Sequence, residues 1–285
     1  MKLKDLGEID TEVVLFGGPY SNLHATRALL DEVARLDAKA ICTGDVVAYG
    51  ADPSATLAAI RDAETDVIAG NCEQQLGTKA RHCGCGFDAG STCDRLSAAW
   101  YAYADERISA EDRDWMRDLP DFACFTQAGR RFAVLHGGAT DVSRFLWSTS
   151  PEADFAQEVE ALQRHLGDID GVIAGHSGIG FIREVAGVTW INAGVIGMPG
   201  HDGRRSTQYA TMRGGVPVLH DLTYDAEGAF ASMQTAGLIQ GYHTGLLSGY
   251  WPSEDVLPPE LRRVSVANGS WVSTRSRRRS SKTWV

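Results

Sequence analysis

Short apolar runs alternate along the chain with segments of helical periodicity. Residues 13–16, 38–43 and 66–69 are compact apolar runs bounded by glycine or polar residues, which is typical of buried strands. Between the first two runs, apolar positions such as Leu29 and Val33 recur near a 3.6-residue period and predict a helix. The first half of the chain therefore has the order expected of βαβ units.

Two helix starts are marked by their capping residues, Asn22 and the pair Asp52-Pro53. Further helices are predicted over 94–106, 110–118 and 152–165, with a weak signal over 228–247. Strands are predicted over 131–135, 171–174, 188–191, 208–212 and 216–222. The second half is thus richer in adjacent strands. This order predicts an α/β fold with two packed sheets, at least one of them partly parallel.

Composition narrows the class of protein. The chain has 285 residues, of which 44% are hydrophobic and 22% charged. These values exclude a disordered or collagen-like chain. No apolar run approaches the roughly 18 residues that a membrane-spanning helix needs. The first residues lack the apolar segment of a secretory signal, so we expect a cytoplasmic protein.

Charge is distributed unevenly. The chain carries 27 basic and 37 acidic residues, yet seven of the basic ones and none of the acidic ones fall within 262–285. We predict one domain over 1–257 and a basic C-terminal tail over 258–285, which is most simply a solvated terminus. The acidic body is a poor electrostatic partner for nucleic acid.

Polar side chains follow four of the predicted strands. Asp45, Asn71, His136 and His176 each stand in a glycine-containing turn directly after an apolar run. Taken singly, each is a common turn or capping residue. Together they meet at the carboxyl edge of an α/β sheet, where ligands bind. One carboxylate, one amide and two imidazoles suit a divalent transition metal such as Zn, Mn or Fe.

Four of the six cysteines are clustered. Cys72, Cys83, Cys85 and Cys93 lie within 22 residues, whereas the other two stand in apolar, strand-like contexts. In a reducing compartment such a cluster more often binds metal or is redox-active than forms a disulfide framework. The alternative is that these cysteines are small buried hydrophobes.

In its ordered motifs the chain resembles the calcineurin-like metallophosphoesterases over about residues 13–222. It is most similar to their compact bacterial phosphatase and phosphodiesterase branch. The matching motifs are Gly44-Asp45, Gly70-Asn71 with Glu73, His136-Gly137 and Gly175-His176. The resemblance implies a four-layer α/β/β/α sandwich of the metallo-dependent phosphatase type.

The departures from the family pattern concern the metal motifs. Gly18 and Tyr20 stand where the family has a carboxylate and an imidazole ligand, and Gly178 replaces another ligand histidine. Cys72 takes the place of the histidine usually assigned to protonating the leaving group. The resemblance therefore implies one intact metal position and one altered position.

The implied function is that of a divergent metal-dependent phosphoesterase. It would hydrolyse a small phosphomonoester or phosphodiester with a metal-bound water. The expected cofactor is one or two ions of Zn, Fe or Mn. The candidate ligands are Asp45, Asn71, His136 and His176, with Cys72, Cys83, Cys85 and Cys93 as further candidates. The candidate catalytic residues are Cys72, His136 and Asn71.

Three residues are candidates for binding the substrate. They are Tyr20, Asn22 and Arg144, although Asn22 equally suits a helix cap and arginines often pair with surface acids. Two other functions remain open. The chain could be a catalytically weak or inactive member of the fold that acts as a metal- or redox-sensitive binding protein. It could also catalyse other chemistry at a thiolate-rich metal centre.

Overall fold

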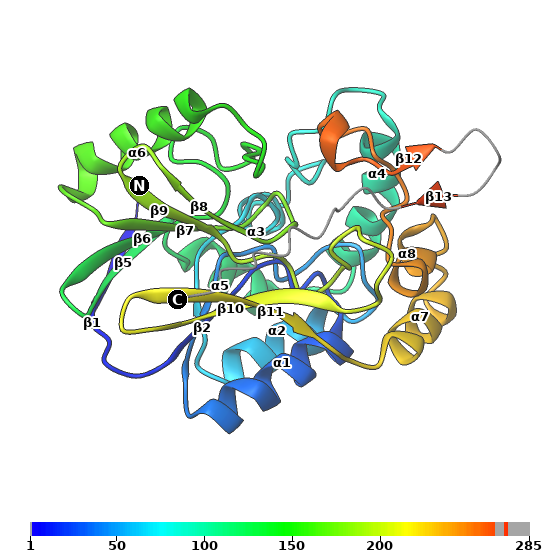
Figure 1. The fold of residues 1–285 in the computed structure, drawn as a ribbon. Helices are drawn as coiled ribbons and strands as arrows, with labels where there is room; N and C mark the ends of the chain where they lie inside the picture. The colour runs from blue at the N-terminus through cyan, green and yellow to red at the C-terminus, as the bar shows by residue number, and fades with distance from the viewer. Residues whose placement is uncertain (1, 266–270, 273–285) are drawn as a thin grey trace, which may run out of the picture.

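Two mixed β-sheets pack face to face in the computed structural model, which describes residues 2–265 and 271–272 (Figure 1). The larger sheet has six strands in the order β1-β5-β6-β7-β9-β8. Their bounds are β1 (Leu3–Glu8), β5 (Phe122–Gln127), β6 (Arg130–Val134), β7 (Gly171–Ala174), β8 (Phe181–Val185) and β9 (Val188–Asn192). Strands β6, β7 and β9 run parallel, so their carboxyl ends share one edge.

The second sheet has five strands in the order β11-β10-β2-β3-β4. They are β2 (Val13–Phe16), β3 (Lys39–Cys42), β4 (Asp66–Val67), β10 (Thr207–Arg213) and β11 (Val216–Leu222). Strands β2, β3 and β4 are parallel, and β10 and β11 form an antiparallel hairpin beside β2. A short antiparallel pair, β12 (Val264–Ser265) and β13 (Trp271–Val272), comes last in the order of elements along the chain.

Helices cover the outer face of each sheet. Figure 1 shows α6 above the six-stranded sheet and α1 and α2 beneath the five-stranded sheet. The helices are α1 (Leu23–Leu36), α2 (Pro53–Asp62), α3 (Asn71–Gly77), α4 (Thr92–Asp105), α5 (Ala110–Asp118), α6 (Glu152–Leu166), α7 (Ala226–Thr235), α8 (Tyr242–Ser248) and the 3₁₀ turn η1 (Pro259–Leu261).

The alternation of side chains along β2 explains its continuous apolar run. Val13 and Leu15 face the core between the sheets, whereas Val14 and Phe16 face the helices. All four residues are fully buried because both faces of this central strand are covered. The inter-sheet core and the two helix-covered outer faces make four layers. The predicted α/β/β/α sandwich is therefore confirmed.

Most predicted elements are present within a few residues of their expected bounds. Asn22 caps α1, with its Oδ1 accepting from the N–H of Ala25 at 3.1 Å. The edge strand β1 was not predicted, because its side chains are mostly exposed and pairing with β5 alone defines it. The weak helix over 228–247 was wrong as one element. It divides into α7 and α8, separated by Gly237 and Gly241 at positive φ.

The predicted division at residue 257 stays a prediction. Leu257 is buried and Leu261 packs in the same small cluster as Ile179 and Trp147. Most of the predicted basic tail, 258–285, lies outside the described residues. Within the described part of the chain, no helix has the length and apolar character to cross a membrane.

Candidate functional site

Four polar side chains meet where strands of both sheets end. Asp45 follows β3, Asn71 opens α3 after β4, His136 follows β6 and His176 follows β7. All four are buried, and the most exposed, His176, shows 8% of its surface. The tertiary structure thus brings together the four residues that the strand-end pattern singled out.

Nε2 of His136 lies at the centre of this group. It is 3.3 Å from Oδ2 of Asp45, 3.1 Å from Oδ1 of Asn71 and 3.0 Å from Nδ1 of His176. On the other side of the ring, Nδ1 donates to the carbonyl oxygen of Thr43 at 2.6 Å. Because that bond requires the proton on Nδ1, the neutral ring presents the lone pair of Nε2 to the cluster.

The amide of Asn71 is oriented from outside the cluster. Its Nδ2 donates to the carbonyl oxygen of Cys83 at 3.0 Å and lies 3.4 Å from Sγ of Cys85. Since these partners accept, they select the nitrogen and leave Oδ1 turned toward His136. The loop that carries the two cysteines therefore positions a candidate ligand.

Glu73 joins the turn after β3 to the turn after β4, a role that was not predicted from the sequence. Its Oε2 accepts from the N–H groups of Asp45 at 2.8 Å and Gly70 at 2.9 Å, and Oε1 accepts from Val46 at 2.8 Å. Burial raises the pKa of Glu73, while these N–H groups oppose the rise. The available signal was its place three residues after Gly70, the capping position of a helix start.

Two of the cluster residues have strained backbone. Asp45 and His176 adopt φ values of 57° and 56°, in the left-handed region that residues other than glycine seldom occupy. Both stand directly after the glycine that ends a strand. Such strain persists only where the surrounding structure imposes it, and it is concentrated at functional sites.

The charges in the cluster are coupled. Burial by itself raises the pKa of Asp45, but His136 and His176 outweigh burial and bring it below its usual value. Burial lowers the pKa of His176 to about 3, and the neighbouring His136 adds to this effect. His176 is therefore neutral near pH 7, with a nitrogen lone pair available to an ion.

This donor set fits a divalent transition metal. Ligand atoms of Asp45, His136 and His176 all lie within 4.8 Å of one another. The 3.0 Å between the facing nitrogens of the two histidines is what two bonds of about 2.1 Å to one ion give at a right angle. Carboxylate, imidazole and amide donors suit Zn, Fe or Mn.

A second metal position has no such donor set. A Cβ on Gly18 would lie 2.5 Å from Cζ of Tyr20, and one on Gly178 would lie 3.0 Å from Cζ2 of Trp251. Two aromatic rings therefore fill the space where side chains at 18 and 178 would begin. Within the described residues, no other group of three His, Cys, Asp or Glu ligand atoms converges in the same way.

The clustered cysteines do not form a ligand shell around the site. Cys83 and Cys85 are joined in a disulfide, so neither sulfur is a thiolate ligand in this state. Cys72 is buried, and its Sγ lies 3.5 Å from Nδ2 of Asn71. Cys93 is a free cysteine on α4 that faces the neighbouring pocket.

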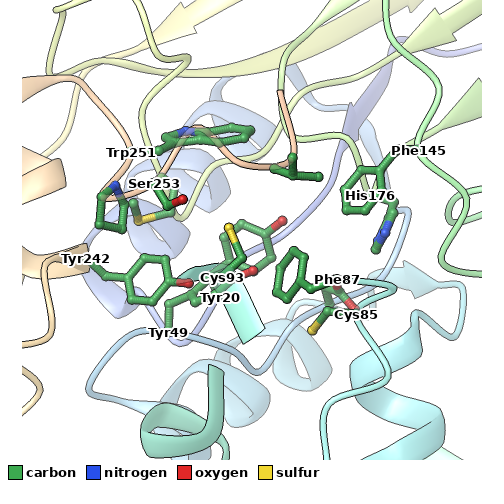
Figure 2. A pocket seen from close by; sticks show the side chains of 14 residues that line it. Tyr20, Tyr49, Cys85, Phe87, Cys93, Phe145, His176, Tyr242, Trp251 and Ser253 are labelled. Carbon is green, nitrogen blue, oxygen red and sulfur yellow. The ribbon is translucent and has the colours of Figure 1, made fainter. Parts of the chain in front are cut away.

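A pocket of about 590 Å³, counting its open mouth, adjoins the cluster at Asp45 and His176. Figure 2 shows Trp251 lying across it, with Tyr242 on the opposite side from His176 and Phe145. The other lining residues are Tyr20, Tyr49, Cys85, Phe87, Cys93, Met198, Pro252, Ser253 and Val256. Few of these residues could be predicted from the sequence, because aromatic side chains from distant segments share no motif.

One wall of the pocket is formed by residues 251–256, which we call the strap. The indole Nε1 of Trp251 donates to the carbonyl oxygen of Pro199 at 2.8 Å, and its backbone N–H donates to Nδ1 of His201 at 3.0 Å. Nε2 of His201 in turn lies 2.7 Å from Oε1 of Glu254. These bonds tie Trp251 and Glu254 of the strap to Pro199 and His201.

The three candidate substrate-binding residues are placed differently. The ring of Tyr20 lines the pocket. Asn22 uses its oxygen to cap α1 and donates through Nδ2 to the carbonyl oxygen of Gly197 at 3.2 Å, so its side chain has a structural role. Arg144 lies outside the pocket lining and bonds to Glu158 at 2.7 Å and to Asp154 at 3.1 Å.

The chain is similar to a known family model and to several solved structures. Residues 18–214 match the model of the calcineurin-like phosphoesterase superfamily domain. A metallophosphoesterase from Sphaerobacter thermophilus aligns with a TM-score of 0.65 and 20% identity, over 85% of this chain and 100% of that one. A hypothetical protein from Pyrococcus horikoshii OT3 aligns with a TM-score of 0.70 and 16% identity, over 84% and 98%. No curated protein matches the chain. At these identities the solved structures support the fold alone.

Proposed function

Because the chain belongs to the calcineurin-like phosphoesterase superfamily, we propose that it is a phosphoesterase that works with a single divalent metal ion. Its substrate is a small phosphomonoester or phosphodiester. The observation that carries the proposal is the convergence of Asp45, Asn71 and His176 on Nε2 of His136. These four residues would hold the ion, which is Zn, Fe or Mn by the chemistry of its donors.

When bound, the ion would polarise a phosphoryl oxygen and lower the pKa of a water molecule. The protein's own contribution is to hold the donors in place. Thr43 fixes the ring of His136, and the loop at Cys83 fixes the amide of Asn71. The aromatic wall of the pocket limits access of bulk water on the side of His176, which strengthens electrostatic interactions there.

In the proposed reaction, the site has only a poor general acid to protonate the leaving group. Cys72 stands at the position where a histidine is expected in the family. Burial raises the pKa of its thiol well above the usual value, and Asp45 adds to the rise. A neutral buried thiol is a poor general acid at neutral pH. We therefore place the best substrates among esters whose leaving groups need little protonation.

Metal content and hydrolysis, measured together, test the proposal. Protein purified without added metal or chelator should contain about one ion per chain by elemental analysis and should hydrolyse a 4-nitrophenyl phosphoester. His136→Ala should lose both properties. His165→Ala, at an exposed position on α6, is the matched control and should keep both. Hydrolysis that persists in His136→Ala at the rate of the control would exclude this site as the source of activity.

A second function is favoured by one contact. The disulfide of Cys83 and Cys85 touches Nδ2 of Asn71, so reduction of the disulfide would loosen a candidate ligand. A non-hydrolytic, redox-sensitive binding protein would use the same contact. Purified protein that binds metal, releases it on treatment with a thiol reductant and hydrolyses no phosphoester would favour this function over the first.

A further inference from the structure

The pocket beside the cluster is aromatic, and among the described residues no permanently cationic side chain lines it. Six of its lining residues carry aromatic rings: Tyr20, Tyr49, Phe87, Phe145, Tyr242 and Trp251. No lysine or arginine is among the described residues that line it. Sites that bind polyphosphates or other multiply charged anions place such cations around the ligand. The described lining of this pocket therefore suits an apolar group better than a multiply charged anion.

The rings are fixed in place before any ligand binds. The ring centroid of Tyr49 lies 4.8 Å from that of Tyr20 and 4.3 Å from that of Tyr242. On the other side, Phe145 stacks on Trp147 at 5.6 Å, and the bond to Pro199 anchors Trp251. A preformed wall spares a ligand the entropic cost of ordering these side chains.

The aromatic wall is continuous with the metal cluster. The ring centroid of Phe145 lies 4.3 Å from that of His176. The rings of Tyr20 and Trp251 occupy the side-chain space of positions 18 and 178, where a second ion would need its ligands. A substrate with its phosphate at the cluster would therefore have its alcohol portion beside the aromatic wall.

From this arrangement we infer that the pocket receives the alcohol portion of the phosphoester, and that this portion is an uncharged aromatic or apolar group. The inference rests on the proposed function for the position of the phosphate. It assigns the substrate class as esters with one phosphate and an apolar alcohol. Nucleotide polyphosphates and other polyanions lie outside that class, because the described lining of the pocket offers them no lysine or arginine.

Binding of non-hydrolysable phosphonates tests the inference without relying on turnover. Dissociation constants of benzylphosphonate and methylphosphonate are measured by calorimetry on protein as purified, with its metal content determined. Burial of one phenyl group should make benzylphosphonate about tenfold or more the tighter ligand. Phe87→Ala and Trp251→Leu should each reduce that ratio severalfold. Phe230→Ala, on α7 outside the pocket, should leave the ratio unchanged.

Each outcome decides between the two proposals. Equal binding of the two phosphonates would overturn the inference and leave the proposed function standing. Failure of both to bind would overturn the phosphate position and, with it, both proposals. An aromatic cage also suits a quaternary ammonium group, so a third probe is (2-trimethylammonioethyl)phosphonate. Tighter binding of that probe than of benzylphosphonate would overturn the assignment of an uncharged alcohol. Two variants are used so that misfolding of one does not decide the test.

Discussion

The indole ring of Trp251 lies against the backbone of Gly178, and a Cβ atom on that glycine would stand 3.0 Å from Cζ2 of the ring. These residues are 73 positions apart in the sequence, and the strap brings them together. An aromatic side chain from elsewhere in the chain therefore closes the space at position 178, which the family resemblance led us to expect for a metal-ligating histidine.

Restoring the histidine alone should not restore a second ion. Gly178→His places a residue with a Cβ at φ 73° and against the indole, so we expect a loss of about 1–3 kcal/mol in the free energy of unfolding. The metal content should stay at that of the wild type. The double variant Gly178→His/Trp251→Ala should lose less stability than the sum of the two single variants, because the ring no longer occupies the space.

Denaturant unfolding and elemental analysis of the two variants check this prediction. Trp251→Ala alone provides the baseline for loss of the indole. A single Gly178→His variant that is as stable as the wild type and gains a second ion would show that the ring yields readily and does not close the position.

Glu73 should be the most sensitive carboxylate of the site for stability. Glu73→Gln replaces one acceptor oxygen with an NH₂ group that faces backbone N–H donors of neighbouring turns. We expect a loss of at least about 2 kcal/mol in the free energy of unfolding, because buried donors are left unsatisfied. Glu160→Gln, at an exposed position on α6, is the control and should change stability by no more than about 0.5 kcal/mol. Similar midpoints in urea for the two variants would count against an anchoring role.

Hydrolysis should depend steeply on the leaving group. A general acid contributes about 10²–10⁴-fold to such reactions, so its weakness should slow an alkyl ester by at least about 10²-fold relative to a 4-nitrophenyl ester. The measurement is kcat/KM for a series of esters, plotted against the pKa of the leaving group. Cys72→Ser should leave the slope unchanged, because the raised pKa of the buried thiol makes it a weak proton donor. Selective slowing of the alkyl esters in that variant would instead assign the acid role to Cys72.

The burial of His201 beside the strap should make the protein sensitive to acid. Burial lowers the pKa of His201, so the unfolded chain binds its proton more readily and stability falls as the pH drops below about 6.5. For Glu254, burial raises the pKa, but hydrogen bonds from Arg263 and His201 outweigh it and lower the pKa. The contribution of Glu254 to the free energy of unfolding is therefore also lost as the pH falls, at lower pH than the contribution of His201.

A comparison of urea midpoints at pH 7.5 and pH 5.5 checks the contribution of His201. His201→Gln keeps a donor near Glu254 but cannot titrate, so its midpoint should fall less between the two pH values than that of the wild type. His165→Ala is the control for loss of an exposed histidine and should follow the wild type. An equal fall in His201→Gln and wild type would remove His201 as the cause.

Local signals in the sequence were sufficient for most elements and for four residues of the site. The apolar runs at β3, β4, β6 and β7 are followed by Asp45, Asn71, His136 and His176. This pattern indicated the site once an α/β sheet was expected, because strand ends in such sheets share one edge. The exposed strand β1 and the division between α7 and α8 escaped prediction. Pairing with β5 defines the first, and glycines at positive φ define the second.

The sequence by itself thus indicated most of the elements and the residues able to meet an ion, and its resemblance to the family implied the four-layer class. Strands β1 and β8 and helix α3 had no predicted counterpart. Only the tertiary structure decided what surrounds the candidate ligands. Packing across long separations placed Trp251 over Gly178 and joined the loop at Cys83 to Asn71. It also turned Arg144 toward Glu158, away from the pocket. Such contacts follow from the meeting of distant surfaces, and no local period or motif encodes them.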